Sequence, residues 1–321
     1  MPAGLAGPQA CPMTTAPPII ETRGLTKRFG SRTAVSDINL TVPAGCAFGF
    51  LGHNGAGKTT LIRMLVSLTQ PSAGIVKVNG WSLADHRERA LARVGAIVEE
   101  PRFHAHLTGR QNLRVVAAAR GPRAGRRIEP ALQRAGLSDR GDDRVGTYSQ
   151  GMRQRLGIAR CLLADPMLVI LDEPMNGLDP GGILELRGLI AGLVAEGRTV
   201  FVSSHLLDEI EKTCHAVAVI DKGRLLAQGP ISQLIGDTHT RYELSCDQPQ
   251  AALSLLAGHP AVAQASQAPG GLLVTLADPR AAGTVTTLLI QAGITVTGFT
   301  PIRTTLADRF LGLASRVGGN K

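Results

Sequence analysis

The sequence of 321 residues carries 34 Lys and Arg against 25 Asp and Glu, a net charge of +9. With 44% hydrophobic and 18% charged residues it has the composition of a globular chain, which excludes long disorder and coiled coil. The length exceeds what one hydrophobic core usually serves, so we expect one large domain and one smaller one. No apolar run approaches the roughly 20 residues of a membrane span, so we do not expect the chain to cross a bilayer.

The N-terminal residues 1–18 are rich in Ala, Gly and Pro and lack the cationic start and apolar stretch of a secretory signal. We expect them to form a disordered tail. The five cysteines are an odd number, widely scattered and without a CxxC pair, so neither a disulfide framework nor a zinc site is expected. A reducing cytosol fits this pattern best.

The positive charge is concentrated in one segment. Between Arg102 and Arg160 there are 13 Arg and 4 acidic residues, which accounts for the whole net charge of +9. Such a segment can face nucleic acid, anionic lipid headgroups or an acidic partner, or it can be the solvated surface of Arg-rich helices.

Residues 19–231 alternate short apolar runs with longer helical patterns, which predicts an α/β domain on a mainly parallel sheet. Asn79-Gly80 and Asp221-Lys222-Gly223 are typical of hairpin turns. A helical subdomain is expected at about 102–163, with Thr108 and Gln111 at capping-box spacing and a Gly- and Arg-rich loop at 120–127. The buried strands are predicted at Cys46–Leu51, Leu168–Leu171, Thr199–Val202 and Ala216–Ile220.

Residues 232–321 predict a separate α+β domain. The order strand, helix, strand, strand, helix, strand, followed by a short helix, is the ferredoxin-like βαββαβ arrangement, with Gly270-Gly271 as the central turn. The predicted strands are Tyr242–Cys246, Ala261–Ser266, Leu272–Leu276 and Ile294–Thr297.

Residues 52–59 match the phosphate-binding loop GxxxxGK[ST] between an apolar strand and a helical pattern. Glycines let the backbone approach a phosphate chain at the positive end of the helix. Lys58 would pair with the β- and γ-phosphates, and the Thr59 hydroxyl would bind Mg²⁺. A Gly-rich turn with an accidental Lys is the alternative. The predicted nucleotide-binding residues here are Gly52, Asn54, Gly55, Ala56, Gly57, Lys58, Thr59 and Thr60.

Asp172 and Glu173 end a buried strand, where a parallel sheet places its ligand crevice. Successive side chains point in opposite directions, so Asp172 can hold Mg²⁺ while Glu173 polarises a water molecule in line with the γ-phosphate. Two carboxylates after a strand can instead cap the next helix.

Residues 148–155, Tyr-Ser-Gln-Gly-Met-Arg-Gln-Arg, lie just before that strand and resemble the ABC ATPase signature, usually LSGGQ. The resemblance implies that Ser149 and Gly151 present a hydroxyl and backbone N–H groups to the γ-phosphate of an ATP bound by a second copy. Tyr148, Gln150 and Met152 depart from the consensus. Ser149 also suits the simple role of a helix N-cap.

Three further elements resemble the ABC family in the expected order and extend the resemblance over 19–230. Gly177-Leu178-Asp179 is similar to the D-loop, which implies that Asp179 is near the nucleotide. His205 is similar to the switch histidine that contacts the γ-phosphate, and Phe29 resembles the aromatic that stacks on adenine. A lone His or Phe is more often core or surface filler.

Two positions depart from the wider family pattern. His53 replaces the Pro usual in the phosphate-binding loop, and we expect its side chain to point outward. Glu99 stands where the Q-loop glutamine is usual, so we predict it as a Mg²⁺ ligand and catalytic residue. The alternative is that Glu99 and Glu100 are surface acids paired with Arg102 or Arg110.

The segment Glu99–Asn112 resembles the bacitracin-resistance and lantibiotic-immunity exporters, where Glu at this position is usual. The stretch Ile294–Leu313, with Thr304–Leu311 near its end, resembles the tail of multidrug, daunorubicin-type and bacitracin-type exporters, with Asp308 and Phe310 matching and Ala307 departing. These resemblances imply an ATP-hydrolysing subunit of an ABC exporter with ATP and Mg²⁺ as cofactors. Its partners would be an ABC-2-type transmembrane permease and a second copy of itself, on the cytoplasmic face of the plasma membrane, with no nucleic acid expected.

Two other functions stay open. A soluble ABC ATPase acting on ribosomes or nucleic acid would account for the Arg-rich segment, although such proteins usually carry two ATPase units or long coiled coils. An ABC importer ATPase is the third possibility. The transported substrate does not follow from this sequence.

Overall fold

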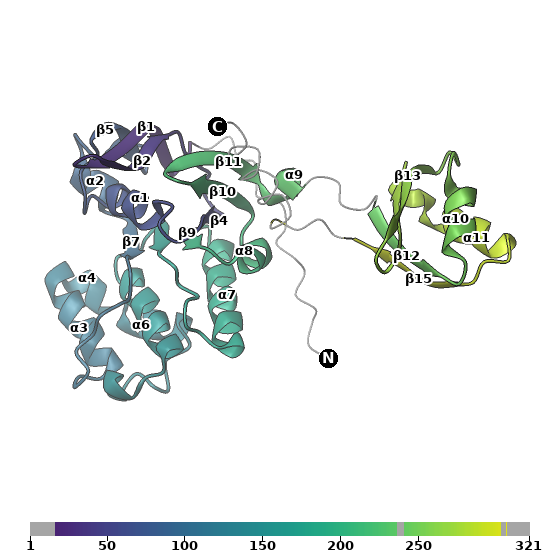
Figure 1. Cartoon of the computed structure of the whole chain (residues 1–321). Helices are drawn as coiled ribbons and strands as arrows, with labels where there is room; N and C mark the ends of the chain where they lie inside the picture. Colours follow the sequence, from purple (N-terminus) through teal and green to yellow (C-terminus); the bar gives the residue numbers. More distant parts are fainter. Residues whose placement is uncertain (1–16, 236–240, 303–305, 307–321) are drawn as a thin grey trace. The chain divides into compact units, whose positions relative to one another are not determined.

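The computed structural model describes residues 17–235, 241–302 and 306. They form two compact units that divide between Ile231 and Ser232 (Figure 1). The predicted disordered tail lies outside the described residues except for its last two, and so does the stretch 304–311 except for Leu306. In the described part of the chain, no helix is long and apolar enough to cross a membrane.

Two sheets form the framework of the first unit (Figure 1). One is antiparallel, in the order β2-β1-β5-β6 with β3 paired to β1. The other, in the order β11-β10-β4-β9-β8-β7, is parallel except for the edge strand β11. The antiparallel strands are β1 (Ile20–Phe29), β2 (Arg32–Ile38), β3 (Thr41–Val42), β5 (Ala73–Val78) and β6 (Trp81–Ser82). The others are β4 (Ala47–Leu51), β7 (Val94–Ile97), β8 (Leu168–Leu171), β9 (Thr199–Ser204), β10 (Ala216–Asp221) and β11 (Arg224–Pro230).

The register of the parallel strands brings distant segments to one edge of the sheet. β9 lies between β4 and β8, with Ser204 opposite Leu51 and Val202 opposite Leu171. The segments that follow these three strands therefore start side by side, which is where open α/β sheets bind ligands.

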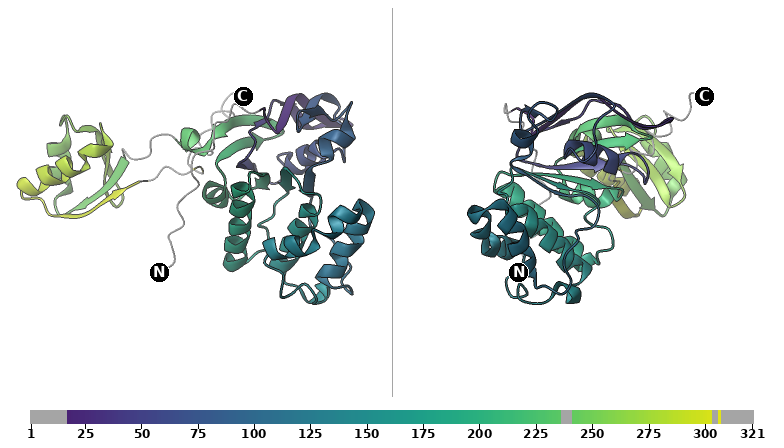
Figure 2. Two further views of the ribbon diagram at one scale, coloured as in Figure 1. Left: turned by 180° about the vertical axis from the view of Figure 1, so that it is seen from behind. Right: turned by 90° about the vertical axis from the view of Figure 1, so that its left-hand side faces the viewer.

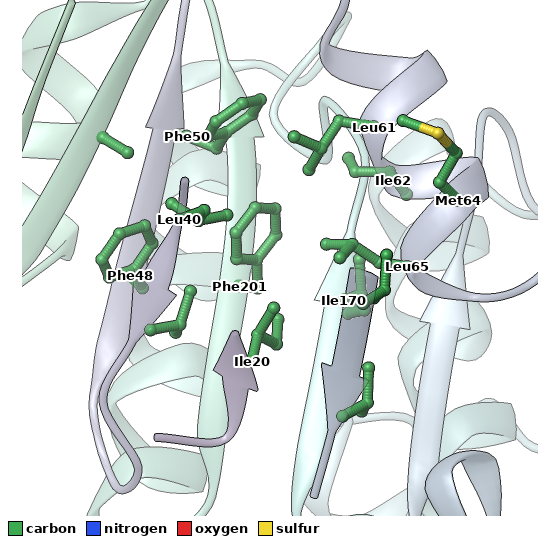
Figure 3. Packing of buried hydrophobic residues seen from close by; sticks show 14 of the residues in the cluster. Ile20, Leu40, Phe48, Phe50, Leu61, Ile62, Met64, Leu65, Ile170 and Phe201 are labelled. Atoms are coloured by element: carbon green, nitrogen blue, oxygen red, sulfur yellow. The ribbon is translucent and has the colours of Figure 1, made fainter. Parts of the chain in front are cut away.

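The core of the first unit lies between its two sheets and helix α1 (Lys58–Leu65) (Figure 3). Phe201 packs against Phe48 and Phe50 with ring centroids 5.8 and 5.6 Å apart. Leu61 and Leu65 of α1 are fully buried. Each such side chain contributes about 1.5–3 kcal/mol of transfer free energy, so the helix after the phosphate-binding loop is firmly held.

The predicted hairpin turns are present. Asn79 and Gly80 between β5 and β6, and Lys222 and Gly223 between β10 and β11, all have positive φ angles, from 46° to 78°. Two consecutive positive φ values form the type I′ turn that matches the twist of the strands.

A helical region connects β7 to β8 and lies together on one side of the sheets in both views of Figure 2. Its first helix begins with the predicted capping box. The Thr108 side chain accepts a hydrogen bond from the Gln111 backbone N–H, and the Gln111 side chain accepts one from the Thr108 backbone N–H. The predicted loop at 120–127 is partly wrong, because Pro122 starts a one-turn helix there. The region contains α3 (Gly109–Arg120), α4 (Pro122–Gly125), α5 (Ile128–Arg134), the 3₁₀ turn η1 (Val145–Thr147) and α6 (Gln150–Leu162). The other helices of the first unit are α2 (Arg87–Leu91), α7 (Pro180–Ala195) and α8 (Leu207–Thr213), and α9 (Ile231–Ile235) spans the division.

The second unit has the predicted βαββαβ order. Its antiparallel sheet runs β13-β14-β12-β15, and the two helices cover a core that includes Leu244, Val274 and Leu289. The last strand starts later than predicted, because the Ile294 N–H bonds to the Leu289 carbonyl and the side chain is buried below the helix end. The elements are β12 (Arg241–Cys246), α10 (Pro249–Leu256), β13 (Val262–Ala268), β14 (Gly271–Leu276), η2 (Pro279–Ala281), α11 (Ala282–Gln291) and β15 (Val296–Pro301).

Candidate active site

The loop between β4 and α1 has a backbone that only small residues permit. Gly55 and Gly57 have φ angles of 82° and 109°, and a Cβ on Gly57 would lie 2.6 Å from the Ala34 carbonyl oxygen. A Cβ on Gly52 would lie 2.5 Å from the Ile220 carbonyl oxygen. The helix begins at Lys58 with no side-chain cap and no acid in its first turn. Its N-terminal N–H groups are thus available to an anion.

Lys58 is held inside this loop. Only 6% of its side chain is exposed, and Nζ donates to the carbonyl oxygens of Gly52 at 2.6 Å and His53 at 3.2 Å. The ammonium also pairs with Glu173 Oε1 at 2.9 Å. The loop carbonyls and the carboxylate together offset the cost of burying the charge. The His53 side chain is exposed.

Glu173 lies between a cation and an imidazole. Its Oε1 faces Lys58, and its Oε2 is 2.9 Å from His205 Nδ1. Glu173 has a φ of 47°, a left-handed conformation that costs on the order of 1–3 kcal/mol outside glycine. Its backbone N–H donates to Ser203 Oγ at 2.9 Å, which helps to hold the strained position.

Asp172 is joined to the same network through Ser203. The Ser203 hydroxyl donates to Asp172 Oδ1 at 2.6 Å, and Asp172 is 4% exposed. Sequence analysis missed Ser203. The available signal was a hydroxyl near the end of a buried strand, two residues before His205.

Lys58 and Glu173 border a cavity of about 200 Å³. The predicted residues Gly52, Ala56, Asp172 and His205 do not line this cavity. Gly52 contacts the lining residue Lys58, and His205 contacts the lining residue Glu173. Asp172 is linked to Glu173 through Ser203. The lining residues are Arg32, Ala34, Asn54, Gly55, Gly57, Lys58, Thr59, Thr60 and Glu173. Arg32 and Ala34 of β2 were not predicted, because nothing in the sequence marks the face that this strand presents to the loop. Two larger cavities, of about 450 and 690 Å³, involve none of the predicted site residues.

Phe29 ends β1 beside the cavity wall. Its strand partner is Arg32, and 52% of Phe29 is exposed. The Lys27 ammonium lies 5.0 Å from the centre of the Phe29 ring. The exposed ring next to a lining residue leaves a flat surface for an aromatic ligand.

The signature-like residues are arranged apart from this cavity. Ser149 is the N-cap of α6 and accepts the Met152 N–H at 3.2 Å, while Asp179 caps α7 and accepts the Gly182 N–H at 3.1 Å. The Gln150 side chain donates to the Asn176 carbonyl at 3.0 Å and joins the two segments. Ser149, Gly151 and Asp179 are not among the residues that line the cavity.

Tyr148, which departs from the signature consensus, is a structural residue. Its side chain is 3% exposed, and its hydroxyl donates to the Arg140 carbonyl at 2.6 Å. Burial raises the pKa of Tyr148 above its usual value. A Cβ on Gly109 would lie 2.4 Å from this hydroxyl, so the ring fixes the start of α3 against α6.

Glu99 lies outside the cavity lining. It follows β7 with a φ of 63°, its side chain is 63% exposed, and Oε1 pairs with Arg63 of α1 at 2.5 Å. This partner is neither Arg102 nor Arg110, the two that we considered for an exposed Glu99.

Comparison with known proteins identifies the family. Residues 35–176 match the family model described as ABC transporter. The chain is 39% identical to the bacitracin transport ATP-binding protein BcrA of Bacillus licheniformis, over 94% of this chain and 98% of BcrA. It is 38% identical to the Nod factor export ATP-binding protein I of Ralstonia nicotianae, over 72% and 71% of the two chains. The chain belongs to the ABC transporter ATP-binding family.

The structures agree with this assignment. A solved ATP-binding subunit of an ABC transporter superposes with a TM-score of 0.60 and 30% identity, covering 67% of this chain and 91% of that one. The predicted P-loop ABC fold is therefore confirmed, and this ABC chain is an ATP-binding subunit that hydrolyses ATP.

Proposed function

We propose that two copies of this ABC subunit bind MgATP between them and use its hydrolysis to drive export through a separately encoded ABC-2-type permease. The observation that carries the proposal is the position of Glu173, with one carboxylate oxygen on Lys58 and the other on His205. A general base must lie within hydrogen-bond reach of the proton that it abstracts, and Glu173 lines the cavity that a phosphate chain would enter beside Lys58.

The geometry gives each residue a role in hydrolysis. A phosphate chain entering the cavity competes with Glu173 for the Lys58 ammonium, because both are anions within reach of one buried cation. Once Lys58 contacts the phosphate, Glu173 is free to accept a proton from the attacking water. His205 keeps the Glu173 carboxylate oriented through Nδ1–H, and in the imidazolium form, where both ring nitrogens carry a proton, it can also donate to the γ-phosphate through Nε2.

The residues present suit a magnesium ion that is bound largely by nucleotide and water. In the described part of the chain, no group of three or more His, Cys, Asp or Glu could hold a metal ion alone. Mg²⁺ typically takes one or two protein oxygens and completes its shell with phosphate oxygens and water. Thr59 and Asp172 would hold it and Glu99 is the further predicted ligand; the ion would neutralise phosphate charge.

A second copy would complete each site. Ser149, Gly151 and Asp179 do not line the cavity that Lys58 and Glu173 border, yet each is placed at or near the start of a helix, where N–H groups favour an anion. Closure of two copies on two ATP molecules and reopening after hydrolysis is a ligand-driven population shift.

Export of an antibiotic or peptide is the transport direction that the relatives favour. One relative is named for bacitracin transport and another for Nod factor export. The subunit would then work at the cytoplasmic face of the plasma membrane, attached through its permease.

Co-purification of this chain with a candidate ABC-2-type membrane protein tests the proposal. In vesicles that expose the ATPase subunits, wild-type complex should hydrolyse ATP faster with a bacitracin-like peptide, and a Glu173→Gln complex should bind ATP without this stimulation. Stimulation by a solute-binding protein would indicate an importer. Co-sedimentation of the chain with ribosomes, and not with the membrane protein, would contradict export.

A further inference from the structure

One stretch of the helical region combines high positive charge with a complete lack of acids. Residues 101–128 contain seven arginines and no Asp or Glu. Arg110 and Arg127 pair with carboxylates outside the stretch. The other five are exposed, and none has an ion pair with any residue that the structure describes. We call these five the basic edge: Arg102, Arg114, Arg120, Arg123 and Arg126.

The backbone keeps most of the basic edge together. Arg120 ends α3, Arg123 is in α4, and Arg126 follows α4 directly, at spacings of three residues. Arg123 and Arg126 share one side of the α4 turn, whereas Gly121, with φ 90° and ψ 177°, breaks the helix between them and Arg120, which stays only three residues away along the chain. Figure 1 shows α3 and α4 at the outer margin of the helical region, with α6 between them and α7.

The exposed side of α3 adds small apolar groups to this charge. Arg114 and Val115 are exposed, Val115 by 51%, and so are Ala118 and Ala119 on the following turn. Short apolar side chains beside arginines permit close approach to a flat surface that is both anionic and partly apolar.

Of the six arginines at residues 129–163, three form ion pairs with described residues, and Arg144, Arg153 and Arg160 form none. Arg134 pairs with Glu196, Arg140 with Asp143, and Arg155 with Glu185. Within these 25 residues the five cations of the basic edge repel one another; Arg114 shares the Asp142 carboxylate with Arg110, and the other four lack this internal neutralisation. An anionic partner outside the chain would neutralise these positive charges.

We propose that the basic edge binds the anionic phospholipid headgroups of a membrane surface. Nucleic acid fits less well, because proteins that grip single strands offer aromatic side chains for stacking. Phe103, the aromatic residue of this stretch, is covered by the Arg160 guanidinium at 5.2 Å. The inference rests on the proposed function only in placing the chain beside a membrane.

Sedimentation of the full chain with lipid vesicles tests the proposal. Wild type should bind phosphatidylcholine vesicles that contain phosphatidylglycerol, and should not bind pure phosphatidylcholine. Replacing Arg120, Arg123 and Arg126 together by Gln should weaken partition about a hundredfold, because each surface arginine contributes roughly a fivefold factor near an anionic leaflet. Binding should also fall steeply with salt.

The matched control removes the same charge elsewhere. Arg28, Arg241 and Arg280 are exposed and have no ion pair in the part of the chain that the structure describes. Their triple Gln variant should partition within a few-fold of wild type. Equal losses in the two triple variants, equal binding to both vesicle types, or duplex DNA binding that outlasts vesicle binding as salt rises would overturn the proposal.

ATP hydrolysis by the same proteins separates this inference from the proposed function. The basic edge does not contact the cavity of Lys58 and Glu173, so its triple variant should hydrolyse ATP in solution at the wild-type rate. A wild-type chain that binds anionic vesicles and hydrolyses no ATP would contradict the proposed function alone.

Discussion

The phosphate-binding half of the predicted site and its signature half are built in different ways. In the first, Lys58, Glu173 and His205 come from three separate parts of the sequence and meet within 2.9 Å contacts. In the second, Ser149 and Asp179 serve as helix N-caps, and neither lines the cavity. One chain therefore provides the groups that hold phosphate and the base, and we propose that the other half of each site comes from a second copy.

The largest effect should follow from changing the base in the first half. Glu173→Gln keeps a hydrogen-bonding side chain beside His205 and removes the proton acceptor, so hydrolysis should fall by at least ~10²-fold. ATP should still bind, because the amide no longer competes as an anion for Lys58. Size-exclusion chromatography with MgATP should then show stable dimers.

Glu185→Gln is a matched control, since Glu185 is 57% exposed and pairs with Arg155 away from the cavity. It should hydrolyse ATP normally. A Glu173→Gln protein that turned over at the wild-type rate and stayed monomeric would remove Glu173 from the role of base.

The second half can be tested without destabilising its helix. Asp is as good an N-cap as Ser, so Ser149→Asp should leave the melting temperature nearly unchanged. It places a negative charge where a γ-phosphate would approach, so ATP-dependent dimerisation should be lost and hydrolysis should fall by about 10²-fold. Analytical ultracentrifugation with and without MgATP measures this.

Ser149→Ala provides the contrast, because it removes the cap and costs about 1 kcal/mol of stability while adding no charge. A Ser149→Asp protein that dimerises with ATP as wild type does would leave Ser149 with its capping role only.

Glu99 should give a smaller effect, and its ion pair supplies a control. If Glu99 binds Mg²⁺, Glu99→Ala should raise the Mg²⁺ concentration needed for hydrolysis with little change in ATP affinity, and Glu99→Gln should be closer to wild type. Arg63→Ala breaks the same exposed ion pair, worth at most ~1 kcal/mol, and keeps the carboxylate.

The measurement is ATPase rate against Mg²⁺ concentration for all four proteins. Superimposable curves would leave Glu99 as a surface acid, and a shift shared by Glu99→Ala and Arg63→Ala would assign the effect to the ion pair.

The smallest effect concerns acid stability of the strand that leads into the phosphate-binding loop. The Ala47 N–H at the start of β4 donates to His215 Nδ1 at 3.2 Å, and burial lowers the pKa of His215 below its usual value near 6.5. The unfolded chain therefore binds this proton more readily, so the contribution is complete above about pH 6.5 and declines as pH falls toward the folded-state pKa.

Thermal unfolding between pH 5 and 8 should show this decline, and His215→Gln, which keeps an acceptor, should flatten it. His86→Gln, at an exposed position, should retain the wild-type profile. Parallel profiles for all three proteins would show that His215 does not contribute.

Local sequence pattern was enough for the four buried strands of the first unit, its two hairpin turns and the phosphate-binding loop, since each depends on neighbours in the chain. Contacts across the sheet were harder to predict. The link from Asp172 through Ser203 to Glu173 depends on the register of β8 and β9, and the Arg63 partner of Glu99 depends on where α1 lies beside β7. Ile294 was predicted to start a strand because an apolar residue after a helical pattern is typical of a buried strand. In the structure its side chain is buried below the helix end instead.

Mixing two inactive variants tests the shared site most directly. Lys58→Ala disables one half and Ser149→Asp the other, so each protein alone should hydrolyse ATP at background rates. In a mixed dimer, the intact phosphate-binding loop of one chain faces the intact signature of the other, which restores one of the two sites. An equal mixture should therefore recover about a quarter of the wild-type rate, because about half of the symmetric pairings are mixed. A mixture that stays at background, although ATP-driven mixed dimers form, would contradict a site divided between two copies.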